Sequence, residues 1–159
     1  MALISPHLWY VKEAVDAARF YCSVFPDSRI DRMTTLPAAT PSGPPGSVAV
    51  VEFTLAGQPF LAISAGPLDA FNHAVSFVVH CDSQAEIDRY WDALLQGGGT
   101  PEQCGWLRDR YGLCWQVVPR RLGDLIADAD RDKGRRTTEA MLGMVKLDIA
   151  ALERAHAGA

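Results

Sequence analysis

The same order of sequence patterns occurs twice in this chain, and this repeat constrains the fold more than any other feature. A shift of 70 residues places Arg19–Tyr21 on Arg89–Trp91 and Asp16 on Glu86. In both copies an apolar run typical of a strand precedes apolar residues at helical spacing, and a hairpin follows. The sequence therefore predicts an α+β fold, in which two βαβββ-type modules form a curled mixed sheet around a cavity.

Turn residues set the expected boundaries. Module one is expected over about residues 3–67, module two over about 73–119 and a helical tail over about 121–157, all within a single domain of 159 residues. Ser83 and Glu86 have the spacing of a capping box. Gly97–Gly99 follow the second helix and predict its C-terminal cap. The expected strands are 3–10, 29–36, 47–55, 59–64, 74–79, 103–108 and 113–118, and the expected helices are 13–25 and 83–96, with two more in the tail.

Composition and charge exclude several function classes. The formal net charge is −4 and the 15 Lys and Arg residues are scattered along the chain, so no nucleic acid partner is expected. No apolar stretch reaches the roughly 18 residues of a membrane span, and the first residues lack a signal-peptide pattern, which predicts a cytoplasmic protein. The four cysteines never form a Cys-x-x-Cys pair, so we expect reduced thiols rather than a zinc knuckle.

Several segments resemble a known family. They are Ser5–Tyr10, Ala17–Ile30 and Cys104–Pro119, together with Met141–Leu152 in the tail. The chain resembles the PhnB-like family of the vicinal oxygen chelate superfamily, which also holds glyoxalases, extradiol dioxygenases, and fosfomycin- and bleomycin-resistance proteins. Members often have the label 3-demethylubiquinone-9 3-methyltransferase domain. An S-adenosylmethionine site normally needs a glycine-rich turn between a strand and a helix, whereas Gly97–Gly99 follow a helix, so methyl transfer is the minor alternative.

The resemblance implies four positions at which metal-using members of the superfamily place His, Gln or Glu ligands. These positions fall on Pro6 or, after a shift of one residue, His7, on Ala62 or Ser64, on Ser76 and on Gln116. Neither Pro6 nor Ser76 is a useful ligand, and one neutral amide cannot hold a metal. No cofactor is therefore predicted, and the alternative is a divalent metal bound through His7, His80 and Gln116.

The expected lining of the cavity follows from the alternation of side chains along each strand. We predict aromatic walls and a few neutral hydrogen-bonding groups, which suit a flat or apolar ligand. A nucleophilic cysteine would need a neighbouring base that the sequence does not identify, so no catalytic residue is predicted. The candidate ligand-binding residues are Leu8, Tyr10, Ser64, Ser76, His80, Cys114 and Gln116.

Taken with the resemblance, these features predict a small-molecule-binding protein of the glyoxalase or bleomycin-resistance type, without the usual metal site of the superfamily. The alternative is an enzyme of the same superfamily that uses a displaced metal or a neutral polar active site. The amphipathic tail either covers the core or docks a second subunit, and we favour a homodimer.

Overall fold

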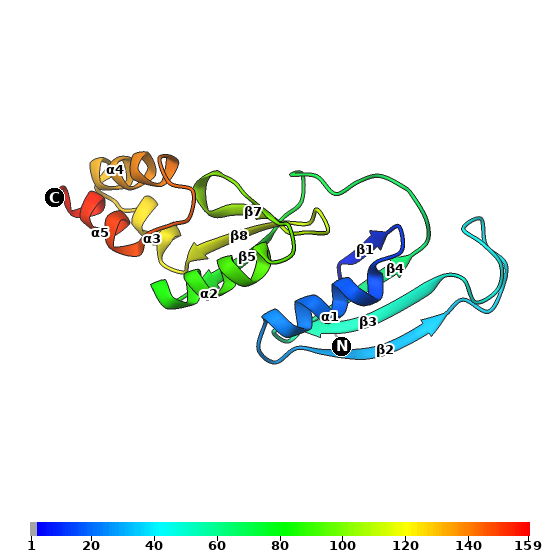
Figure 1. Cartoon of the computed structure of the whole chain (residues 1–159). Coiled ribbons are helices and arrows are strands. Elements are labelled where there is room, and N and C mark those ends of the chain that lie inside the picture. Colours follow the sequence, from blue (N-terminus) through cyan, green and yellow to red (C-terminus); the bar gives the residue numbers. More distant parts are fainter. Residues whose placement is uncertain (1–2) are drawn as a thin grey trace. The chain divides into compact units, whose positions relative to one another are not determined.

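The computed structural model describes residues 3–159 and forms two compact units, one up to Ala70 and one from Phe71 onward (Figure 1). Each unit holds one four-stranded mixed sheet, with strand order β1-β4-β3-β2 in the first and β5-β8-β7-β6 in the second. In both sheets the strand that comes first in the chain lies at an edge and pairs in parallel with the strand that comes last in the chain, β1 with β4 and β5 with β8. This is the predicted two-module α+β fold. No helix in residues 3–159 is long and apolar enough to cross a membrane.

Module one begins later than the sequence predicts. The expected strand 3–10 forms only from His7, where pairing with β4 begins, and Leu3 is almost fully exposed. β3 pairs antiparallel with both β2 and β4. The elements are β1 (His7–Tyr10), α1 (Ala14–Val24), β2 (Arg29–Thr35), β3 (Ala49–Leu55) and β4 (Gln58–Ser64).

Helix α1 covers one face of the module-one sheet. Its buried residues Ala14, Ala17, Ala18 and Tyr21 lie at spacings of three and four, and the small alanines allow the helix to approach the strands closely. The Tyr21 hydroxyl lies 3.2 Å from the Tyr10 hydroxyl, and both side chains are buried. This contact fixes the end of β1 beneath the helix, because buried hydroxyls need hydrogen-bond partners.

Module two repeats this arrangement. Its helix starts as predicted, because the Ser83 hydroxyl accepts a hydrogen bond from the Glu86 backbone N–H at 3.2 Å. After its last turn the Gly99 N–H donates to the Leu95 carbonyl at 3.0 Å, so the glycines form a C-terminal turn. The elements are β5 (Phe77–Cys81), α2 (Gln84–Leu95), β6 (Thr100–Pro101), a 3-10 turn (Gln103–Gly105), β7 (Trp106–Arg108) and β8 (Cys114–Pro119).

One buried carboxylate organises the β7–β8 hairpin. Asp109 is 4% exposed, and its Oδ1 accepts from the backbone N–H groups of Tyr111 at 2.8 Å and Leu113 at 3.1 Å. Its Oδ2 accepts from the indole N–H of Trp115 at 2.9 Å. A single side chain therefore satisfies two turn amides and a buried ring donor.

The tail forms three helices rather than two: α3 (Leu122–Ile126), α4 (Arg131–Leu142) and α5 (Ile149–Ala157). Asp130 and Asp148 cap the last two helices, which explains why the chain starts a new helix at each. Leu147 and Leu152 are fully buried in a cluster with Val118 and Leu122. The tail therefore covers the core of module two, and a homodimer stays a prediction.

Candidate functional site

The strands of module one present a face covered by α1 and an open face. Leu8 and Tyr10 are buried on the covered side. Ser64, opposite Tyr10 in β4, accepts a hydrogen bond from the Ala14 N–H at the start of α1, at 3.0 Å. Because side chains alternate along a strand, His7 projects from the open face.

Leu8, Tyr10 and Ser64 thus lie on the side opposite to the expected cavity lining. The shift of 70 residues aligns Leu8 with the exposed Val78, whereas the structurally equivalent last residues of the two edge strands, Tyr10 and Cys81, differ by 71 (81 − 10). A slip of one residue exchanges the two faces of a strand. These three residues therefore belong to the packing of α1 on its sheet.

In module two, three of the four predicted residues, Ser76, His80 and Gln116, lie on the open face. The side chain of Gln116 donates from Nε2 to the Ser76 hydroxyl at 2.9 Å. His80 lies further along β5, paired with Val118, and is exposed. Cys114 shares the parity of Gln116 but is fully buried. The structure therefore brings Ser76 and Gln116 into contact and places His80 beyond them.

The thiol of Cys114 does not have the environment of a nucleophile. Burial, followed by the carboxylates of Glu102 and Asp109, raises the pKa of this thiol. A raised pKa keeps the group protonated near neutral pH, whereas a nucleophilic cysteine needs the thiolate. Cys114 therefore acts as a buried structural residue.

A polar cluster beside this face was not identified from the sequence. Glu102 Oε2 lies 2.7 Å from His73 Nε2, and Glu102 Oε1 accepts from Arg108 Nε at 2.8 Å. The imidazole of His73 lies with its ring centroid 6.0 Å from that of Trp106, which pairs with Gln116 across β7 and β8. His73 is in the loop before β5, and no spacing in the sequence connects it to Glu102.

The carboxylate of Glu102 is held in its ionised form. Partial burial alone would raise the pKa of the Glu102 carboxyl, but the hydrogen bonds from His73 and Arg108, together with their charges, hold this pKa below its ordinary value. Hydrogen bonds to the charged form of an acid favour that form. Glu102 is therefore a fixed negative charge between a base and a guanidinium.

The residues at the strand pairings that correspond between the two modules do not fit a divalent metal ion. In module one His7 pairs with Leu61, and in module two Val78 pairs with Gln116. Each pairing therefore offers one polar side chain opposite an alkyl group, and the nitrogen of the Gln116 amide is already engaged by a hydroxyl. In residues 3–159 no three His, Cys, Asp or Glu side chains gather in a way that could hold a metal ion.

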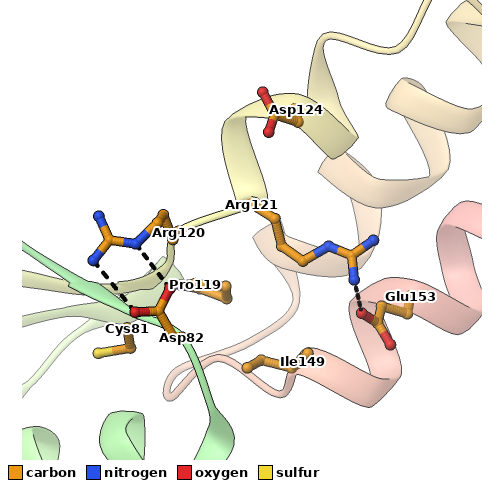
Figure 2. A pocket seen from close by; sticks show the side chains of 8 residues that line it. All are labelled: Cys81, Asp82, Pro119, Arg120, Arg121, Asp124, Ile149 and Glu153. Carbon is orange, nitrogen blue, oxygen red and sulfur yellow. Dashed lines mark hydrogen bonds and ion pairs between the residues drawn. The ribbon is translucent and has the colours of Figure 1, made fainter.

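A separate recess of about 270 Å³ lies at the carboxyl ends of β5 and β8, beside the tail (Figure 2). Arg120 forms an ion pair with Asp82 at 2.8 Å, and Arg121 forms one with Glu153 at 2.6 Å. Each guanidinium therefore already faces a carboxylate. The first ion pair joins the segments that follow β8 and β5, and the second joins the start of the tail to α5, so the recess is a junction between tail and module. The lining residues are Cys81, Asp82, Pro119, Arg120, Arg121, Asp124, Ile149 and Glu153.

Comparisons with known proteins agree with this architecture. The family model described as 3-demethylubiquinone-9 3-methyltransferase matches residues 2–118. A PhnB protein from Bacillus cereus that carries the same methyltransferase name is 28% identical, with a TM-score of 0.65, and the match covers 74% of this chain and 99% of that one. The tail lies outside the family match, although its sequence suggested the same likeness.

More distant structures share the fold. The fosfomycin resistance protein FosX from Mesorhizobium loti is 16% identical, with a TM-score of 0.54, and the match covers 80% of this chain and all of that one. The trypanothione-dependent glyoxalase I of Leishmania major is 10% identical, with a TM-score of 0.50, and the match covers 81% of this chain and 95% of that one. No curated protein sequence matched. The chain belongs to the family whose model is described as 3-demethylubiquinone-9 3-methyltransferase, the PhnB-like family that its sequence resembles.

Proposed function

We propose that the protein binds a small organic molecule on the open face of module two, through neutral hydrogen bonds and an aromatic surface rather than through a metal ion. The observation that carries this proposal is the hydrogen bond between Gln116 and Ser76, beside Trp106. Polar side chains that present a few directed groups next to an aromatic ring are typical of ligand-binding surfaces.

The bond between the two side chains leaves two donors, the Ser76 hydroxyl and the second N–H of Gln116, together with an acceptor for a ligand. The hydroxyl of Ser76 accepts from Gln116 and keeps its own proton to donate. The amide oxygen of Gln116 remains an acceptor. Trp106 and the 44% exposed Val78 pair with Gln116 from its two neighbouring strands and add apolar surface. These groups suit a flat, partly apolar molecule with a neutral polar substituent.

Methyl transfer is less well supported than binding. At the start of each module's helix one backbone N–H already donates to a serine hydroxyl, that of Ser64 in module one and that of Ser83 in module two. The glycines at 97–99 follow α2 instead of preceding a helix. Neither module therefore offers the strand–glycine turn–helix arrangement on which cofactor recognition of that kind depends.

A thermal-shift screen of flat neutral compounds tests the proposal, because a ligand at 100 times its dissociation constant stabilises the folded state by about 2.7 kcal/mol. We expect hits with the wild type, before and after chelator treatment, and smaller shifts with Gln116→Leu and Ser76→Ala. Gln58→Leu makes the same chemical change at an exposed position of module one and serves as the matched control. Equal shifts in all variants, or shifts that chelation removes and zinc restores, would contradict the proposal.

A further inference from the structure

We propose that His73, oriented by Glu102, accepts the proton of an acidic hydroxyl group, phenolic or enolic, on the ligand of module two. This inference rests on the proposed function and names the class of its ligand. His73 would be the group that touches the ligand, and Glu102 would be a positioning residue that acts through it.

The tautomer of His73 follows from its partner. An ionised carboxylate only accepts hydrogen bonds, so the contact of 2.7 Å between Glu102 Oε2 and His73 Nε2 places the ring proton on Nε2. In the neutral ring the other nitrogen, Nδ1, then carries the lone pair, and no hydrogen bond within residues 3–159 engages it. A His held in this way is oriented as a base, in the same manner as the carboxylate–imidazole pairs of acid–base sites.

Two local contacts keep this pair beside the open face. The Asn72 side chain accepts from the Ala74 N–H at 2.8 Å, which shapes the loop that carries His73. The Glu102 N–H donates to the Trp106 carbonyl at 2.8 Å, which ties the carboxylate to the start of β7. The base therefore lies next to the aromatic ring of Trp106, on which a flat ligand would stack.

The proton transfer balances without any other reactant. The O–H bond of the ligand breaks, an N–H bond forms at Nδ1, and the oxygen keeps the electron pair as a phenolate or enolate. The imidazolium that results has the Glu102 carboxylate on one side and the new anion on the other. The class of ligand follows from this step, because only a hydroxyl of unusual acidity, such as a phenol or enol with an electron-withdrawing substituent, loses its proton readily to imidazole.

The imidazole of His73 and the guanidinium of Arg108 both contact the carboxylate of Glu102. Cys114, opposite Arg108 in β8, stays a neutral thiol because burial raises its pKa. The side chain of His73 is 56% exposed, so solvent screens the pair. We therefore expect the effect of one partly exposed ion pair, a shift of about half a pKa unit in a bound phenol.

The test uses 4-nitrophenol, whose absorption separates its neutral and ionised forms, with 4-nitroanisole as a methylated probe that has no acidic proton. In the presence of excess wild-type protein, the pKa of 4-nitrophenol should fall by about half a unit. His73→Asn should abolish this fall and leave the binding of 4-nitroanisole intact, and Glu102→Gln should reduce the fall. His156→Asn, a matched change at a histidine of α5 that also contacts a carboxylate, should leave it unchanged.

The outcomes separate this inference from the proposed function. If 4-nitrophenol binds but titrates as it does in water, or if His156→Asn abolishes the shift as fully as His73→Asn does, the role of His73 is wrong. The role of His73 is also wrong if 4-nitroanisole binds and 4-nitrophenol does not. In each case the proposed function stands as long as Gln116→Leu weakens probe binding. If neither probe nor any compound of the thermal-shift screen binds, the proposed function itself fails.

Discussion

Replacement of Asp109 tests the account of the β7–β8 hairpin. The substitution Asp109→Ala removes the acceptor of three donors: the backbone N–H groups of Tyr111 and Leu113 and the indole N–H of Trp115. A buried donor left without a partner costs about 1–3 kcal/mol. The indole N–H and the Leu113 N–H are buried, and the Tyr111 N–H is partly accessible to water, so we expect a total loss of about 3–5 kcal/mol.

Urea unfolding of the purified protein, followed by tryptophan fluorescence, measures this loss. Asp92→Ala, an exposed position on α2, is the control and should change the free energy of unfolding by less than about 0.5 kcal/mol. Trp115→Phe removes the buried ring donor, so the double variant with Asp109→Ala should lose less than the sum of the two single losses. A loss below about 1 kcal/mol for Asp109→Ala, or strict additivity in the double variant, would refute the reasoning.

Three further changes test other parts of the structure. Leu152→Ala in the tail should cost about 2–5 kcal/mol in urea unfolding because the side chain is fully buried, whereas Leu142→Ala, 59% exposed, should cost under about 0.5. Gly134→Ala should destabilise by about 1–3 kcal/mol because its new Cβ would lie 2.3 Å from the last carbonyl oxygen of α3, and Gly123→Ala, which meets open space, should not. Burial, then nearby carboxylates, raises the pKa of the Cys81 thiol from 9.0 to about 11. Iodoacetamide at pH 8 should therefore leave Cys81 unmodified until urea unfolds the chain, and the stability that the protonated thiol contributes below pH 9 should be lost as the pH rises toward 11.

The fold could be predicted because its signals are periodic. Apolar spacing, the Ser83 cap and the turn glycines specify each module locally, and the repeat shows that the pattern is used twice. The face to which a strand residue points is harder to predict, because a slip of one residue exchanges the two faces. The spacing between the edge strand and the helix also differs between the modules. Leu8 and Tyr10 therefore pack beneath α1 instead of lining a cavity, while ligand binding by Ser76 and Gln116, which contact each other, stays a prediction.

The polar cluster was not predictable for a different reason. His73 and Glu102 come from two irregular segments, and their contact depends on loop conformations that no periodic pattern describes. Arg108 could have been placed near Cys114 from the hairpin alone, because the two residues pair across β7 and β8. Its carboxylate partner could not, since the turn before β7 includes a left-handed residue, Cys104, that no sequence rule indicates.

The two modules have different residues at corresponding strand pairings of their sheets. At the equivalent pairing of edge strand and neighbour, module one has His7 opposite Leu61 and module two has Val78 opposite Gln116. The polar side chain therefore lies on the edge strand in module one and on the neighbouring strand in module two. Neither pairing provides two side chains that could coordinate a metal ion from one sheet. In module one the nearby polar groups of the open face, Arg32 and Glu52, neutralise each other in an ion pair. In module two Ser76 and Gln116 meet beside Trp106, and for this reason we propose recognition of a neutral flat molecule at that face.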